Sequence, residues 1–285
     1  MRILAYGKLN LFFNICGTLK NGYHSIESVF QTVDLANIIN INLAENIQIK
    51  CDDPEIPTDQ SNTCYKAIKS FCAHTKIKTG ASIIIHKKIP TQAGMGGASA
   101  DAAAVLTGLN KLTKANLKKE ELIKIGAKIG ADVPFCLTQG TALCEGIGEN
   151  ITSLPHFDVG EYVIVKPEHG ISTAEAYIKY DKVKNTIIPP TYNIQNMIQN
   201  IERKDVIDVG YSLYNVFEQI SDFNELSYIK KSIKRTGAIG TLMTGSGSAV
   251  FGIFEKSGRK AAKALSRKFK EVYHCKPLKQ ITNDR

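Results

Sequence analysis

A glycine-rich stretch at Pro90–Ala104, with the sequence PTQAGMGGASADAAA, holds the residues best suited to chemistry in this chain. The run before it, ASIIIHKKI at 81–89, is β-branched and predicts a strand. The run after it, at 99–113, has Ala and Leu at nearly helical spacing and predicts a helix. We therefore expect the stretch to lead from a strand into the N-terminus of a helix.

The residues of this turn suit an anion. Gly94, Gly96 and Gly97 can adopt positive φ angles and let a ligand approach the main chain without a Cβ in the way. Ser99 either caps the helix or offers its hydroxyl to a ligand. Because the first N–H groups of a helix are unpaired and its dipole is positive at that end, the turn predicts a phosphate site.

A glycine turn alone is a weak signal, and two common nucleotide motifs do not account for this one. Neither GxxxxGKS nor GxxxxGKT occurs in the chain, so the turn is not a Walker A loop. Gly94 and Gly96 fit the dinucleotide fingerprint, but Ser99 stands in place of its third Gly and no acidic residue follows at the expected distance. The rest of the chain must therefore decide what the turn does.

Three further polar residues could contribute to a site, and each also has an ordinary structural explanation. Lys8 and Asn10 point to the same side of the strand predicted at 2–16, which is either an exposed edge or a functional face. Asp132 lies in a Gly-Ala-Asp turn, where it either caps or solvates the turn or faces the anion site. The sequence leaves these alternatives open.

Two other turns carry weaker signals. Asn21-Gly22 predicts a tight turn, and Tyr23 and His24 follow it, although a pair of this kind is more often packing than chemistry. The segment Gly245-Ser246-Gly247-Ser248 lies between two apolar runs and predicts a turn between two strands. Neither turn indicates a function by itself.

The composition is that of an ordinary soluble globular protein. The 285 residues suffice for one or two domains, and the net charge of +9 favours anionic partners, although dispersed Lys residues also suit a solvated surface. The seven Cys form no CxxC pair and no zinc-type cluster, which suits a reducing cytosol. The first residues do not resemble a signal peptide, and no run approaches the roughly 18 apolar residues of a membrane span. We therefore expect a cytoplasmic protein with no membrane partner.

Periodicity and turn residues predict the remaining elements. Further strands are expected at 25–35, 40–51 and 161–167, with a strand–turn–strand unit at 239–254. Further helices are expected at 62–75, 117–129 (between an Asn116 cap and Gly130), 172–180, 215–220, 227–235 and 257–273. Three segments are expected to be irregular: a linker at 150–160, an excursion at 181–200 and the loosely held basic end at 274–285.

Stretches along the chain resemble, in order, the motifs of the GHMP small-molecule kinases. Gly7-Lys8-Leu9-Asn10-Leu11 resembles the first motif, PTQAGMGGASADAA the second, which is the phosphate loop, and TLMTGSGSAVFG the third. NGYHSIESVFQTVDL at 21–35 and GADVPF at 130–135 resemble the member that acts on a cytidyl-diphospho polyol, and Asn215-Val216-Phe217-Glu218 looks like a degenerate copy of another of its segments. The resemblance covers most of the chain and is thinnest at 181–210.

The resemblance implies a fold and a reaction. The fold would be the two-domain α+β GHMP kinase fold, with an N-terminal ribosomal-protein-S5-like domain at 1–155 that carries the phosphate loop and a C-terminal ferredoxin-like α/β sandwich domain at 156–285. The reaction would transfer a phosphoryl group from ATP to the 2-hydroxyl of the cytidyl-diphospho polyol, in the non-mevalonate route to isoprenoid precursors. Mg²⁺ is expected with ATP, held mainly by phosphates and water, with no protein metal ligand assigned. The chain would be a monomer or a homodimer.

The resemblance also implies a role for each matching residue. Asp132 would accept the hydroxyl proton, and Lys8 would stabilise the developing charge. Tyr23 would stack on the cytosine with Tyr177 as the opposite ring, and His24 would bond to the pyrimidine edge. The residues expected to hold ATP are Pro90, Gly94, Met95, Gly96, Gly97, Ala98, Ser99 and Ala100. The residues expected to contact the substrate are Asn10, Tyr23, His24, Asp132, Thr173, Tyr177, Gly245 and Ser246.

Several positions depart from the family pattern, and two other functions compete. Gln92 stands where Gly is usual, Met95 replaces Leu, and Ala98 and Ala100 replace Gly and Ser, so a hydroxyl that could contact phosphate or metal is lost at 100. Ser99 and the glycines remain, so an active site is expected. One alternative is another GHMP kinase, of the homoserine or mevalonate type. The other is a basic RNA-binding domain, but the chain lacks a basic-aromatic cluster, so no nucleic-acid partner is expected.

Overall fold

The computed structural model describes residues 1–279, which form two compact units. The first unit comprises Met1–Gly7, Leu35–Ile89 and Gly96–Thr138. The second unit comprises Lys8–Asp34, Pro90–Met95 and the residues from Gln139 onward. The chain passes from one unit to the other inside the glycine-rich turn, between Met95 and Gly96. The predicted domain boundary at 155/156 stays a prediction.

The sheet of the first unit has the order β3-β4-β2-β1. Ile83 of β4 lies at its centre, antiparallel to Ile41 of β2 and parallel to Ile49 of β3. These three Ile side chains are buried, as expected for β-branched residues on a covered sheet face. The strands are β1 (Arg2–Thr18), β2 (His24–Ala44), β3 (Gln48–Cys51) and β4 (Gly80–His86), of which β1 and β2 continue into the second unit.

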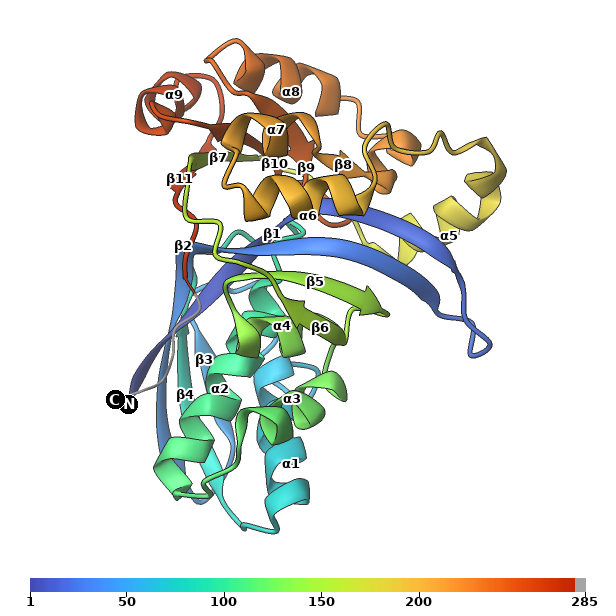
Figure 1. Ribbon diagram of the computed structural model, residues 1–285. Helices are drawn as coiled ribbons and strands as arrows, with labels where there is room; N and C mark the ends of the chain where they lie inside the picture. Colours follow the sequence, from blue (N-terminus) through green and yellow to red (C-terminus); the bar gives the residue numbers. More distant parts are fainter. Residues whose placement is uncertain (280–285) are drawn as a thin grey trace. The chain divides into compact units, whose positions relative to one another are not determined.

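Four helices cover one side of β3 and β4 in the first unit (Figure 1). α1 packs on α2, and α4 packs on both α2 and α3. Asn62 begins α1 by accepting a hydrogen bond from the N–H of Cys64, and Ile68 and Phe71 are buried on its inner face. The helices are α1 (Thr63–Thr75), α2 (Gly97–Thr113), α3 (Lys119–Ala127) and α4 (Val133–Thr138).

The second unit contains strands on the continuations of β1 and β2 and a separate four-stranded sheet. β5 pairs with β2 and with β6, and β8 pairs with β1. The separate sheet has the antiparallel order β11-β7-β10-β9. The strands are β5 (Thr141–Gly146), β6 (Asn150–Ser153), β7 (Glu161–Lys166), β8 (Tyr214–Asn215), β9 (Gly240–Met243), β10 (Val250–Phe254) and β11 (Glu271–Cys275).

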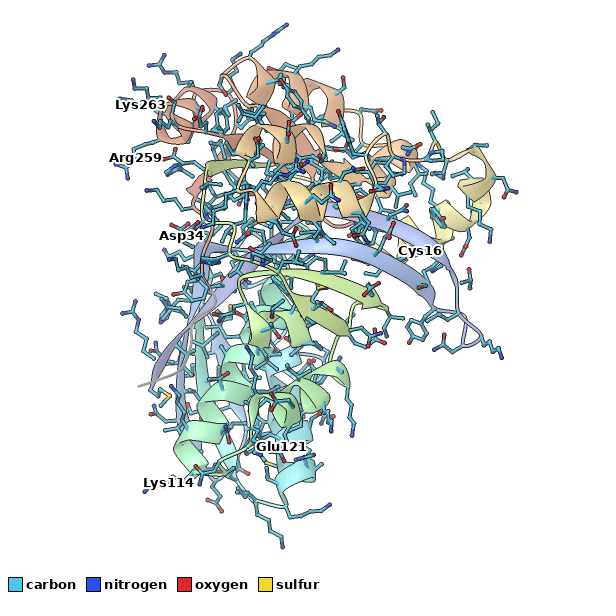
Figure 2. The ribbon with its side chains drawn as sticks, in the orientation of Figure 1. Cys16, Asp34, Lys114, Glu121, Arg259 and Lys263 are labelled. Atoms are coloured by element: carbon cyan, nitrogen blue, oxygen red, sulfur yellow. The ribbon has the colours of Figure 1, made fainter. Side chains whose placement is uncertain are left out.

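Helices cover both faces of the four-stranded sheet. A Cβ on Gly252 of β10 would meet Ile233 of α8, whereas the neighbouring Ile253 lies against Gly210 of α7. Successive residues of a strand face opposite sides, so α8 and α7 lie on opposite faces. Figure 2 shows Arg259 and Lys263 extending outward from α9. The helices are α5 (Thr173–Val183), η1 (Lys184–Thr186), α6 (Ile194–Glu202), α7 (Val206–Tyr211), η2 (Val216–Ile220), α8 (Leu226–Lys234) and α9 (Gly258–Leu265).

Two expected boundaries in the first unit are wrong. The strands expected at 25–35 and 40–51 are one long strand, β2, followed by the short β3, because Asn37 makes tertiary hydrogen bonds instead of a turn. Asn116 does not cap α3. It has a left-handed φ of 53°, and the amide side chain of Asn110 instead bonds both main-chain groups of Leu117. α3 therefore begins only at Lys119.

Other expectations for the second unit also need correction. The linker expected at 150–160 contains β6, which pairs with β5, and the excursion expected at 181–200 contains the end of α5 and most of α6. The helix expected at 257–273 ends at Leu265, because Val272 belongs to β11 and pairs with Val165 of β7. An apolar residue at position 272 can face the core from a helix or from a strand, so the pattern of apolar residues does not distinguish the two.

The segment after β11 is not loosely held at its beginning. The N–H of Leu278 donates to the carbonyl of Thr32 at 2.9 Å, and the N–H of Lys276 donates to Asp34 Oδ1 at 2.8 Å. Residues 280–285 of the segment expected to be loose lie outside the described residues. Among residues 1–279, no helix is long and apolar enough to cross a membrane.

Candidate active site

Main-chain conformation, and not a capping side chain, builds the N-terminus of α2. Gly96 is the N-cap with a φ of 69°, and no side chain accepts a hydrogen bond there. Ser99 lies inside the first turn, so the alternative that Ser99 caps the helix is wrong. The N–H of Ala100 donates to the carbonyl of Gly96 at 2.9 Å, whereas the amides of Gly97, Ala98 and Ser99 precede the first intrahelical bond. The N-terminus of α2 therefore presents three consecutive amides that are suited to bind an anion.

A buried network that the sequence analysis did not single out supports this junction. Asn37 donates from Nδ2 to Asp101 Oδ1 at 2.8 Å and accepts from the N–H groups of Lys88 and Ile89 at 2.9 Å each. Lys87 Nζ lies 3.7 Å from Asp101 Oδ2. Burial raises the pKa of Asp101, an effect that Lys87 and Asn37 oppose. The one signal in the sequence was a lone Asn between the runs predicted as strands at 25–35 and 40–51.

Asp132 lies beside the same helix end within the first unit. It immediately precedes α4, and its carbonyl accepts from the N–H of Cys136 at 3.0 Å. A Cβ on Gly130 would lie 3.7 Å from Ser99 Oγ, so the turn that carries Asp132 lies against the first turn of α2. Asp132 is half-buried. This placement favours the functional alternative over a merely solvated turn.

Lys8 and Asn10 are buried in the second unit, so the alternative of an exposed strand edge is wrong. Lys8 Nζ donates to Asn10 Oδ1 at 2.6 Å and lies 4.6 Å from the centre of the Phe30 ring. Asn10 Nδ2 donates to Ser28 Oγ at 3.0 Å, and the N–H of Asn10 donates to Thr244 Oγ1 at 3.1 Å. An ammonium in a buried place must be hydrogen-bonded, and this network holds it in one position.

The first half of the glycine-rich turn packs on the second glycine-serine turn. A Cβ on Gly94 would lie 2.0 Å from the carbonyl oxygen of Thr244, so only glycine permits this approach. The carbonyl of Met95 accepts from the N–H of Lys8 at 3.0 Å. Asn215 Nδ2 holds the other turn by donating to the carbonyls of Met243 and Gly245 at 2.7 and 2.8 Å. All these residues belong to the second unit.

Aromatic rings gather where the cytidyl substrate is expected. The His24 ring stacks on that of Tyr177, with centroids 4.8 Å apart and planes at 22°. His24 Nε2 lies 3.0 Å from Asp181 Oδ1, and this hydrogen bond is the main reason that the pKa of Asp181 is lowered. Tyr177 also meets Phe217 edge to face at 5.1 Å. Tyr23, in contrast, is 61% exposed.

Thr173 and Ser246, two further predicted substrate contacts, bond to each other. Their hydroxyl oxygens lie 2.9 Å apart. Ser172 begins α5, the helix predicted at 172–180, by accepting from the N–H of Glu175, and Thr173 is the first residue of the helix. Ser246 is buried, so in this arrangement its hydroxyl orients Thr173.

The two units therefore each assemble part of the predicted site. The first unit brings Gly96, Gly97, Ala98, Ser99 and Asp132 together at the start of α2. In the second unit, Lys8 bonds to Asn10 and Met95, and Gly94 packs on Gly245. In the same unit, Thr173 bonds to Ser246 and His24 stacks on Tyr177. Ala100 is not brought to the exposed helix end, because its methyl group is buried and its amide is bonded. Within residues 1–279, no three His, Cys, Asp or Glu side chains lie together as metal ligands.

Two family models match the chain. Residues 62–140 match the N-terminal domain of GHMP kinases, and residues 197–272 match the C-terminal domain of GHMP kinases. The first match contains the start of α2 and the Asp132 turn. Together with the mixed helices and strands of both units, the matches confirm the predicted two-domain α+β GHMP fold.

Curated relatives match along nearly the whole chain. A protein of Clostridium tetani named 4-diphosphocytidyl-2-C-methyl-D-erythritol kinase is 41% identical over 283 residues, which covers 98% of this chain and 100% of the relative. Proteins of the same name from Caldicellulosiruptor bescii and Clostridium botulinum are 42% and 39% identical, covering 95% and 96% of this chain and 96% and 98% of the relatives.

Solved structures show the same fold. A crystal structure of 4-(cytidine 5'-diphospho)-2C-methyl-D-erythritol kinase has a TM-score of 0.80 at 27% identity and covers 97% of this chain and 98% of that chain. A mevalonate kinase of Methanococcus jannaschii has a TM-score of 0.73 at 18% identity and covers 98% of each chain. The second likeness concerns the fold alone.

Proposed function

This chain belongs to the family of 4-diphosphocytidyl-2-C-methyl-D-erythritol kinases, and on that premise we propose that it phosphorylates the 2-hydroxyl of 4-diphosphocytidyl-2-C-methyl-D-erythritol. ATP is the phosphoryl donor of a GHMP kinase, and the product is the 2-phosphate. The observation that best supports this substrate is the identity of 39–42% over nearly the full length to kinases of that name. The proposed place of the reaction is the non-mevalonate route to isoprenoid precursors, in the cytoplasm.

The start of α2 is the proposed cradle for the ATP phosphates. The amides of Gly97, Ala98 and Ser99 point from a helix N-terminus, where the dipole attracts negative charge. Lys87 adds a positive group, since its Nζ lies 3.4 Å from the place of a Cβ on Gly97. Because Gly97 has no side chain, nothing of residue 97 separates the Lys87 ammonium from the helix end. The helix N-terminus and the Lys87 ammonium, which also pairs with Asp101 at 3.7 Å, both favour an anionic ligand over a neutral one.

Asp132 and Lys8 are the proposed reacting groups of the chain. An alcohol is a far weaker acid than a carboxylic acid, so Asp132 accepts the proton late, as the new O–P bond forms. The Lys8 ammonium stabilises the charge that develops on the oxygen. Its bond to Asn10 Oδ1 orients the ammonium without neutralising it, because an amide carries no charge.

The cytosine is proposed to bind at the aromatic cluster. Tyr23 is exposed and offers a ring face for stacking, and Tyr177 is already oriented by His24 and Phe217. The carboxylate of Asp181 favours the His24 tautomer with its proton on Nε2, which leaves Nδ1 as an acceptor. The exocyclic amine of cytosine is a donor that such an acceptor can read. Thr173 and Asn10 are the proposed contacts to the diphosphate and polyol.

Mg²⁺ is proposed to arrive with ATP. It prefers oxygen ligands and keeps several waters, so phosphate oxygens and water supply most of its shell. The Ser99 hydroxyl, in the first turn of α2, is an oxygen donor of the type that Mg²⁺ accepts. The ion neutralises phosphate charge when bound, while the amides of α2 and Lys8 act on the protein side.

A coupled kinase assay tests the proposal. The purified chain is given ATP with the cytidyl-diphospho substrate, with homoserine or with mevalonate, and ADP release is followed. We expect turnover with the cytidyl substrate and none with the other two. Preference for homoserine or mevalonate would reject the substrate assignment. Release of ADP without any acceptor would reject the kinase reaction itself.

A further inference from the structure

Lys166 is a buried lysine that the proposed reaction does not use. It ends β7, is 6% exposed, and donates from Nζ to the carbonyls of Pro167 at 2.6 Å and His169 at 3.4 Å. A buried ammonium is tolerated only with such partners. These bonds fold the beginning of the segment Pro167–Ser172, here called the 167–172 loop, back onto the end of β7.

Ser248 ties the same loop to the first half of the glycine-rich turn. Its hydroxyl donates to the carbonyl of His169, which thus accepts from two donors. The N–H of Ser248 donates to the carbonyl of Gln92 at 3.3 Å. Ser248 is fully buried, so these bonds do not compete with water.

The side chain of Gln92 lies against Gly170 of the loop, at the surface of the second unit. A Cβ on Gly170 would lie 2.0 Å from Gln92 Oε1 and 2.6 Å from Gln92 Cβ, so Gly170 has no room for a side chain beneath it. Gln92 has a φ of 50°, a conformation that costs about 1–2 kcal/mol for a residue with a Cβ. A glycine would relieve this strain but would remove the side-chain contact with Gly170.

The far end of the loop sets the start of α5. Ser172 caps the helix, Thr173 bonds to Ser246, and Tyr177 lies one turn further along. The loop therefore joins Gln92, in the proposed nucleotide turn, to two of the proposed substrate contacts. All of these residues belong to the second unit.

We propose that Gln92 is a positioning residue that couples the nucleotide to the substrate helix through the 167–172 loop. A nucleotide that orders the Pro90–Met95 segment thereby orders Gly170 and the start of α5, and the polyol substrate then binds to an arrangement already formed. This inference rests on the proposed function for the meaning of Thr173 and Tyr177. By linkage, the polyol substrate increases the affinity for the nucleotide by the same factor as the nucleotide increases the affinity for the polyol substrate.

Hydrogen exchange tests the coupling without the polyol substrate. Amide exchange of peptides covering 167–177 is measured with and without a non-hydrolysable ATP analogue. We expect the analogue to slow exchange about fivefold or more in the wild type and not in Gln92→Gly, although both bind the analogue. Gln139→Gly is the matched control, since Gln139 also has a left-handed φ, of 62°, and should keep the wild-type response.

Gly170→Ala gives a second, independent test. As a single substitution, its methyl group collides with Gln92, so the analogue should slow exchange less than in the wild type. Added to Gln92→Gly, it should leave the exchange response of that variant unchanged. An unchanged response in Gln92→Gly, or additive effects of the two substitutions, would overturn the coupling. Turnover of the cytidyl substrate by the wild type, measured in the same preparation, tests the proposed function separately.

Discussion

His24 and Tyr177 stack face to face, with ring centroids 4.8 Å apart and planes at 22°, although they come from distant parts of the chain. The contact joins the first residue of β2 to α5 within the second unit. Asp181, on the same helix, fixes the imidazole through Nε2. Tyr177 and Asp181 therefore hold the His24 ring from two sides, whereas the neighbouring Tyr23 is largely exposed.

Replacing Tyr23 with Ala should weaken the binding of the cytidyl substrate and should have little other effect. Base stacking on an aromatic ring contributes about 1–3 kcal/mol, which corresponds to a rise in KM of about 5- to 150-fold. The KM for ATP and the melting temperature should stay unchanged, since Tyr23 is 61% exposed. Tyr211→Ala is the control, because Tyr211 is equally exposed and lies at the end of α7. A KM for the cytidyl substrate equal to that of the wild type would contradict the stacking role.

Replacing Asp132 with Asn should abolish most turnover while sparing nucleotide binding. The amide cannot accept the hydroxyl proton, so kcat should fall about 10²- to 10⁴-fold. Calorimetry with a non-hydrolysable ATP analogue should give the wild-type affinity, because the amides of α2 remain. Asp208→Asn, on the exposed side of α7, should leave both quantities unchanged. If kcat in Asp132→Asn stays near the wild-type value, another group is the base.

Replacing Gly94 with Ala should unfold the junction that it forms with Thr244. The new Cβ would lie 2.0 Å from the Thr244 carbonyl oxygen, and the φ of 71° adds strain. We expect the free energy of unfolding to fall by more than about 4 kcal/mol. Gly237→Ala provides the comparison: its φ is 98° and a Cβ there meets nothing within 4 Å, so only about 1–2 kcal/mol should be lost. Urea unfolding measures both, and equal losses would show that close packing at Gly94 is unimportant.

The stability contributed by Asp101 should fall as pH rises. Burial raises its folded pKa above the ordinary value of 3.8, so the native state keeps this proton longer than the unfolded chain does. Stability is therefore lost as pH rises from the unfolded value through the folded value. Asp101→Asn removes this titration, so its stability relative to the wild type should improve from pH 4 upward and then level off. Urea unfolding at a series of pH values checks this, and a difference independent of pH would refute it.

The sequence alone determined the parts of this protein that depend on neighbouring residues. The turn from a strand into α2 follows from glycines placed before an Ala- and Leu-rich run, and α1 and α5 begin where Asn62 and Ser172 offer capping oxygens. The order of three glycine-bearing motifs was enough to indicate a GHMP kinase. Such features are readable because each requires particular residue types at a fixed spacing.

Tertiary structure alone decided which polar residues act together. Asn37 lay between two strands that were predicted separately, yet it holds Asp101 of α2 and the amides of Lys88 and Ile89. Gln92 departed from the usual glycine of the motif, yet its side chain contacts Gly170, which is distant in the sequence. Val272 fitted a helix face as well as the strand that it joins. Contacts between residues far apart in the chain leave no local pattern, because either partner alone is compatible with many surroundings.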